Sequence, residues 1–156
     1  MKLEEYFGSK IPKYAILSHC WGIREVTFQD INGPHWRQMT GAIKIELAAA
    51  YCYKNNYDYI WIDTCCIDKT SSAELLEAIN SMCSWYEGAD ICYVYLEGVA
   101  SDPNTVDTGA DIRGSKWFKR GWTLQELIVP QRIASLDLEW NHLGTKQSLS
   151  NVIRYH

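Results

Sequence analysis

The chain has 156 residues, of which 47% are hydrophobic and 22% charged; this predicts one folded domain over residues 1–156 and excludes a disordered chain. Its formal net charge of −4 argues against non-specific nucleic-acid binding, which depends on lysine and arginine neutralising phosphates. No apolar run approaches the roughly 18 residues that span a bilayer, and the opening segment MKLEEYFGSKIPKY has no signal-peptide core, so we expect a cytoplasmic protein without a membrane segment.

The first half of the chain shows a strand, a helix and a second strand. Residues 14–18 (YAILS) are short and apolar, as in a buried strand, and Gly22 interrupts the chain soon after them. Residues 41–56 carry Ile43, Leu47 and Ala50 at helical spacing. Residues 59–64 (YIWIDT) are almost continuously apolar, which is typical of a parallel strand covered on both faces.

The clearest helix follows over residues 71–89. Its apolar positions recur at alternating steps of four and three, which places them on one helix face. Ser71 and Glu74 have the spacing of a capping box at its start. Residues 91–96 (ICYVYL) form a third apolar run and predict a third strand. The apolar positions of the helix are Leu75, Ile79, Met82, Tyr86 and Ala89.

The last third of the chain is less regular. Residues 97–115 are polar and predict a flexible loop. Residues 117–129 predict a short helix closed by Pro130, and residues 132–140 alternate, which predicts a strand with one solvated face. Thr145 predicts the start of a final helix that runs to His156.

Six cysteines are distributed along apolar periodic segments and form no CxxC pair. Zinc sites use such pairs with histidines at matched spacing, and disulfide frameworks belong to secreted proteins. We therefore expect free thiols, no metal site and a reducing compartment. The cysteines are Cys20, Cys52, Cys65, Cys66, Cys83 and Cys92.

The alternation of strands and helices predicts an α/β fold in which a mostly parallel central sheet is flanked by helices. Ligands of such sheets bind at the carboxyl ends of the strands. The segments to examine are therefore residues 18–22, residues 63–68 and the connection 96–122. Neither GxGxxG nor GxxxxGKS occurs in the chain, so neither a Rossmann fingerprint nor a P-loop is supported.

Three segments resemble the heterokaryon incompatibility (HET) family of fungi. They are YAILSHCWG (residues 14–22), the stretch from YIWIDTCCIDK through ICYVYL (residues 59–96), and SKWFKRGWTLQELIVP (residues 115–130). The resemblance covers about residues 14–145. It departs from the family at Lys69, where many members have glutamine, and at His19-Cys20, where a threonine often precedes the tryptophan.

HET domains in turn resemble TIR domains, which are flavodoxin-like three-layer sandwiches. In TIR enzymes a helix after the third strand carries W-x-x-x-E-L, and its glutamate is catalytic in NAD hydrolysis. Trp122, Glu126 and Leu127 match that motif here. The resemblance implies a TIR-like fold and a cell-death function in fungal allorecognition and immunity. It also implies NAD(P) as substrate rather than cofactor, activation by self-association, and an NLR-like receptor as a possible partner.

The chemistry of NAD cleavage agrees with these residue types. Nicotinamide leaves as a neutral molecule, and positive charge develops on the ribose. A carboxylate beside the ribose stabilises that charge, while arginine suits a pyrophosphate through bidentate hydrogen bonds. Glu126 is the catalytic candidate; the alternative for it is a solvated helix glutamate. Glu74 is either a helix cap or a residue at the cleft rim.

The remaining candidates for substrate binding surround the strand ends. Asp63 either supports the loop after the first strand, pairs with Arg120, or contacts a ribose hydroxyl. Arg120 is a surface cation, a phosphate ligand, or the group that orients Glu126. Trp21 and Trp122 are core residues or pocket walls. Ser18, at the end of the first predicted strand, is the last of the substrate-binding candidates.

Two functions remain open at this point. One is an NAD(P) glycohydrolase that releases nicotinamide. The other is a non-catalytic signalling or oligomerisation module, in which the same aromatic residues would be interface anchors. A serine or cysteine hydrolase built from Ser18, His19 and Cys20 is disfavoured, because neighbours on an extended chain point to opposite faces.

Overall fold

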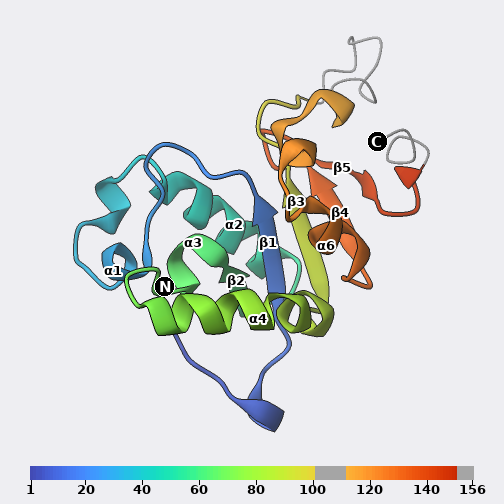
Figure 1. Cartoon of the computed structure of the whole chain (residues 1–156). Helices are drawn as coiled ribbons and strands as arrows, with labels where there is room; N and C mark the ends of the chain where they lie inside the picture. Colours follow the sequence, from blue (N-terminus) through green and yellow to red (C-terminus); the bar gives the residue numbers. More distant parts are fainter. Residues whose placement is uncertain (101–111, 151–156) are drawn as a thin grey trace.

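A computed structural model of the chain describes residues 1–100 and 112–150. It contains one five-stranded sheet with the strand order β2-β1-β3-β4-β5 (Figure 1). The first four strands pair in parallel, and β5 pairs antiparallel to β4. The strands are β1 (Ala15–His19), β2 (Ile60–Ile62), β3 (Ile91–Tyr95), β4 (Ile133–Leu136) and β5 (His142–Thr145).

Helices cover both faces of the sheet. One face packs against α1, η2 and α2, and the other against α4, η3 and α6. The predicted three-layer α/β fold with a mostly parallel sheet is therefore confirmed, and the order 2-1-3-4-5 is the flavodoxin-like one. The helical elements are η1 (Gly8–Lys10), α1 (Phe28–Ile31), η2 (Trp36–Gln38), α2 (Ala42–Lys54), α3 (Asp63–Cys66), α4 (Ser72–Gly88), η3 (Lys116–Lys119) and α6 (Thr123–Ile128).

Strand β1 is an interior strand of the sheet and lies between β2 and β3. All five of its residues are buried, because side chains of a strand alternate between two faces and both faces are covered here. Ala15 and Leu17 belong to the core beside α2, whereas Ile16 belongs to the core beside α4. Ser18 therefore points toward the α4 and α6 side, and His19 points away from it.

The start of α4 shows half of the predicted capping box. Ser71 Oγ accepts a hydrogen bond from the Glu74 backbone N–H at 3.3 Å, and no return bond from the Glu74 carboxylate accompanies it. The complete box occurs at α1 instead, where Thr27 and Asp30 exchange both bonds. Ser71 thus satisfies one of the unpaired N–H groups at this helix start, and Glu74 is left exposed.

Two predicted strands differ from the structure. The second strand ends at Ile62, and Asp63 begins the short helix α3. The strand predicted over 132–140 is only β4, and all four of its residues are buried, because β3 and β5 flank it and helices cover it. Leu138 and Trp140, which produced the alternation, lie in the turn after it, where Trp140 has a φ of 64°.

The carboxyl-terminal part adds two further differences. The helix predicted over 117–129 is divided into η3 and α6. Thr145 ends the antiparallel strand β5, although Ser148 N–H does donate to its hydroxyl at 3.2 Å. Most of the loop predicted over 97–115 falls on residues 101–111, and half of the last helix predicted over 145–156 falls on residues 151–156; both stretches lie outside the described residues.

None of the helices within residues 1–100 and 112–150 combines the length and the apolar composition that a bilayer crossing requires.

Candidate active site

A cleft of about 590 Å³ opens where β1 and β2 end. Cys20 and Trp21 reach it from the end of β1, and Asp63 reaches it from the end of β2. Helix α4 supplies an apolar wall, and η3, α6 and the turn between them supply the opposite wall. The α4 wall consists of Leu75, Ala78, Ile79, Met82 and Tyr86, and the opposite wall of Lys116, Arg120, Gly121, Trp122, Gln125 and Glu126.

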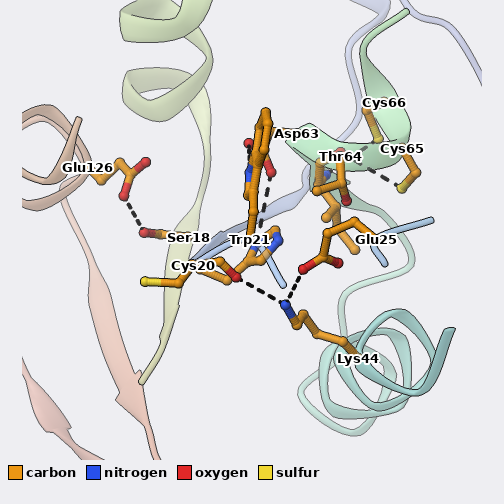
Figure 2. Close-up of polar contacts among 12 residues, drawn as sticks. Ser18, Cys20, Trp21, Glu25, Lys44, Asp63, Thr64, Cys65, Cys66 and Glu126 are labelled. Carbon is orange, nitrogen blue, oxygen red and sulfur yellow. Dashed lines mark hydrogen bonds and ion pairs between the residues drawn. The ribbon is translucent and has the colours of Figure 1, made fainter. Parts of the chain in front are cut away.

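Glu126 lies in the first turn of α6 and is only 5% exposed although it lines the cleft. Its carboxylate accepts two parallel hydrogen bonds from Arg120, Nη1 to Oε2 and Nη2 to Oε1, each 3.0 Å long. Ser18 Oγ donates a third hydrogen bond to Oε2 at 2.6 Å (Figure 2). A bidentate arginine fixes both the position and the plane of a carboxylate. Glu126 is therefore a held side chain rather than a solvated helix glutamate.

Ser18 is itself held by a buried tryptophan. Trp117 Nε1 donates to Ser18 Oγ at 2.6 Å, and Trp117 is 1% exposed. A buried indole N–H needs an acceptor, and Ser18 provides it from the carboxyl end of β1. Thr123 Oγ1 donates to the Trp117 carbonyl and joins the start of α6 to the same tryptophan. Ser18 is 99 positions from Trp117 and 108 positions from Glu126 in the chain. Its two hydrogen bonds therefore join distant segments and fix the position of the Glu126 carboxylate.

Asp63 and Trp21 form the second polar centre of the cleft. Trp21 Nε1 donates to Asp63 Oδ2 at 2.7 Å (Figure 2). The Lys69 ammonium lies 4.3 Å from the centre of the Trp21 ring and donates to the Asp63 carbonyl at 2.8 Å. Burial raises the pKa of Asp63, and the Lys69 charge and the Trp21 hydrogen bond oppose that rise. Burial also lowers the pKa of Lys69.

The loop after β1 is anchored by an ion pair. Lys44 Nζ, from α2, lies 2.6 Å from Glu25 Oε1 and donates to the Cys20 carbonyl at 3.1 Å (Figure 2). Gly22 N–H donates to the same Glu25 oxygen. Both side chains of the pair are about nine-tenths buried, at 12% and 10% exposure. The pair therefore fixes the backbone that presents Trp21 to the cleft.

His19 lies beneath this loop, 1% exposed. Burial lowers its pKa well below the ordinary 6.5, and the charges of Lys44, Arg120 and Lys69 lower it further. Its Nδ1 is 3.8 Å from Asp63 Oδ1, too long for a hydrogen bond. Among the described residues, neither ring nitrogen has a hydrogen-bond partner. His19 is thus a neutral, buried imidazole on the face of β1 opposite to Ser18.

The residues expected at the site divide into three groups. Trp21, Asp63, Arg120, Trp122 and Glu126 all line the cleft. Ser18 is 1% exposed and stands behind Glu126 rather than in the cleft wall.

Glu74 lies outside the set of lining residues and is exposed on α4. Of the alternatives for Arg120 and Asp63, the structure shows the pair between Arg120 and Glu126, and it shows Asp63 bound to Trp21 of the loop after β1.

Three further residues line the cleft: Cys20 and Lys116 lie inside the segments that the strand ends indicate, although neither is a predicted substrate-binding residue, and Lys69 lies one residue beyond such a segment. Lys69 was visible only as a departure from the family pattern. The apolar stripe of α4 was visible as a helix face, but periodicity does not distinguish a face that meets the core from one that lines a cleft. Ile79, on that stripe, is 44% exposed.

Comparisons with known proteins agree with the sequence pattern. A family model described as heterokaryon incompatibility protein (HET) matches residues 14–111. Vegetative incompatibility protein HET-E-1 of Podospora anserina is 43% identical over 152 residues, a stretch that covers 94% of this chain and 11% of that protein. No solved structure matches the chain. The match to the family model ends before Glu126, whereas the match to the relative extends over nearly the whole chain. The chain belongs to the heterokaryon incompatibility (HET) family.

Proposed function

We propose that this domain is an NAD(P) glycohydrolase that releases nicotinamide in a cell-death response and becomes active on self-association. One observation carries the proposal: the Glu126 carboxylate is buried, held by Arg120 and Ser18, and still lines a cleft of about 590 Å³. The likeness of Trp122 and Glu126 to the W-x-x-x-E-L motif of TIR enzymes supports the same role. The vegetative incompatibility after which HET-E-1 is named supports the biological setting.

The chemistry asks little of the protein beyond a placed negative charge. The bond between ribose C1′ and the nicotinamide nitrogen breaks, and its electron pair leaves with nicotinamide as a neutral molecule. Positive charge remains on the ribose until water attacks C1′ and releases a proton. A fixed carboxylate lowers the energy of that charged state without reorganising at the moment of reaction. Arg120 and Ser18 supply this fixation for Glu126.

A second function has one observation in its favour. Leu124 and Ile128, four residues apart on α6, are 67% and 63% exposed. Residues at this spacing share a helix face, and exposed apolar side chains on one face suit an interface. A non-catalytic signalling module would use that face to assemble, with no reaction in the cleft.

The test is an assay of nicotinamide release by the domain fused to an oligomeric scaffold, supplied with NAD and separately with NADP. We expect release by the clustered wild type and a loss of at least about a hundredfold in Glu126→Gln. Glu77→Gln is the matched control, because Glu77 is exposed on α4 and lies outside the cleft lining. Absence of release by the clustered wild type would reject the enzyme, and equal release by wild type and Glu126→Gln would reject the role of Glu126.

A further inference from the structure

We propose that Trp21 and Lys69 form a subsite for the adenylate half of a dinucleotide. The dinucleotide then lies in the cleft with its adenylate at Trp21 and its nicotinamide at Trp122. The proposal rests on the proposed function for the identity of the dinucleotide, but the subsite itself is argued from the cleft. It concerns Lys69, at a position where many members of the family have glutamine.

Trp21 is positioned to stack on the flat ring of a ligand. It lines the cleft with 55% of its surface exposed, and the hydrogen bond from its Nε1 to Asp63 holds one edge of the indole. The Lys69 ammonium occupies one face of the ring, 4.3 Å from its centre. Because Lys69 covers one face, a ligand would stack on the other face of the ring. Base–aromatic stacking is a common mode of nucleotide binding, because every base has such a face.

Lys69 has the charge that a phosphate requires. Lys69 Nζ donates to two backbone carbonyls, Asp63 O at 2.8 Å and Thr64 O at 3.4 Å. These contacts hold the ammonium near the end of β2, and a carbonyl does not cancel its charge. No carboxylate of residues 1–100 or 112–150 lies within ion-pair distance of Lys69 Nζ. Arg120, the other part-buried cation of the cleft, is engaged with both oxygens of Glu126. Lys69 is therefore the better placed cation for an anionic group.

The charges near the two tryptophans determine which half of the dinucleotide binds at each ring. A cation behind the Trp21 ring weakens the attraction of that ring for a positively charged nicotinamide, whereas a neutral adenine is tolerated. At the other wall, Trp122 is 47% exposed, and no lysine or arginine of residues 1–100 or 112–150 lies over its ring. The two tryptophans are therefore unequal, and each suits a different half of the dinucleotide.

Direct binding tests the subsite independently of any reaction. The probes are 5′-AMP, nicotinamide mononucleotide and inorganic phosphate, each titrated into the domain by calorimetry. We expect 5′-AMP to bind the wild type, with about tenfold weaker binding in Lys69→Gln and in Trp21→Ala. Trp21→Phe, which keeps a ring, should stay within about threefold of the wild type. Lys119→Gln, a loss of charge on η3 outside the cleft lining, is the matched control.

The outcomes separate the claims. Unchanged 5′-AMP binding in both Lys69→Gln and Trp21→Ala overturns the subsite, as does a wild type that binds no 5′-AMP. Equal losses for 5′-AMP and nicotinamide mononucleotide in Trp21→Ala overturn the direction of the ligand. Equal affinity for phosphate and 5′-AMP shows that the ring does not contribute and also overturns the proposal. If 5′-AMP binds as expected while clustered protein releases no nicotinamide, the glycohydrolase fails and the subsite stands.

Discussion

Arg120 and Glu126 lie six residues apart, on either side of the turn between η3 and α6, and meet through two hydrogen bonds of 3.0 Å. The pair joins a part-buried guanidinium to a carboxylate that has almost no contact with solvent, with side-chain exposures of 23% and 6%. A carboxylate in that position needs its partner, because an uncompensated buried charge is costly. The stability of the domain and the geometry of the proposed site therefore depend on one contact.

Removing only the arginine should be worse than removing the pair. Arg120→Ala leaves Glu126 buried without its main partner, and we expect a loss of about 3 kcal/mol in the free energy of unfolding. The double variant Arg120→Leu, Glu126→Met replaces both charges by apolar groups and should recover most of that loss. Urea unfolding of the two variants measures both values. A change below about 0.5 kcal/mol in Arg120→Ala would show that the pair is solvated in solution.

The start of α4 should separate stability from activity. Ser71→Ala removes the acceptor of the Glu74 N–H bond, and we expect it to lower the free energy of unfolding by about 1 kcal/mol. Glu74→Gln should change it by less than about 0.5 kcal/mol, because the side chain is exposed. Nicotinamide release by clustered Glu74→Gln should equal that of the wild type. A loss of release of about tenfold or more would place Glu74 back at the site.

Gly41 is packed against the backbone of the loop that carries Glu25. A Cβ at this position would lie 2.4 Å from the Arg24 carbonyl oxygen and 2.9 Å from the Glu25 Cα. We expect Gly41→Ala to destabilise the domain by about 1–3 kcal/mol, since backbone must move to admit the methyl group. Gly121→Ala is the control, because a Cβ there meets no atom within 4 Å. Urea unfolding compares them, and equal stability of the two variants would contradict this packing.

His19 should make stability depend on pH. Its folded pKa lies well below the ordinary 6.5, so below pH 6.5 the unfolded chain takes up a proton that the folded chain refuses, and stability falls as the pH is lowered. Asp63 acts in the opposite direction, because its raised folded pKa adds stability as the pH falls toward 3.8.

The measurement is urea unfolding at about pH 7 and about pH 5.5, on either side of the ordinary histidine pKa. We expect the wild type to lose about 1 kcal/mol more than His19→Asn, which does not titrate in this range. Equal losses in the two proteins would mean that His19 is accessible to protons in the folded state.

Local patterns predicted the parts of the fold that are regular over long stretches. The apolar periodicity of α4 and the apolar runs of β1 and β3 gave elements within about two residues of the observed bounds. The alternation before Trp140 misled, because a buried strand and the turn after it together imitate a half-exposed strand. Strand β5 was not predicted, because it has only four residues and one of them is Gly144, a residue type that is rare in strands.

The site was predictable in its residue types and not in its contacts. The motif around Glu126 placed a carboxylate on a helix after the third strand, but three roles were open for Arg120, and only the folded chain selects the pair with Glu126. The pair between Glu25 and Lys44 joins a loop to α2 across 19 positions and has no signature in the sequence. Contacts of this kind depend on how elements pack, which periodicity does not encode.

The hydrogen bonds around Ser18 run in one direction, from Trp117 to Ser18 and from Ser18 to Glu126, and this direction limits where a proton can move. The indole N–H of Trp117 is a donor only, so Ser18 must accept from Trp117 with a lone pair and donate its hydrogen to Glu126. Arginine does not release its protons in proteins, so the Arg120 contacts also run one way. Neither Trp117 nor Arg120 accepts a proton, so no proton relay continues through these contacts from Glu126 into the interior. Any proton that reaches or leaves this carboxylate must pass through the cleft, which favours a role as a standing charge over one as a relay to the interior.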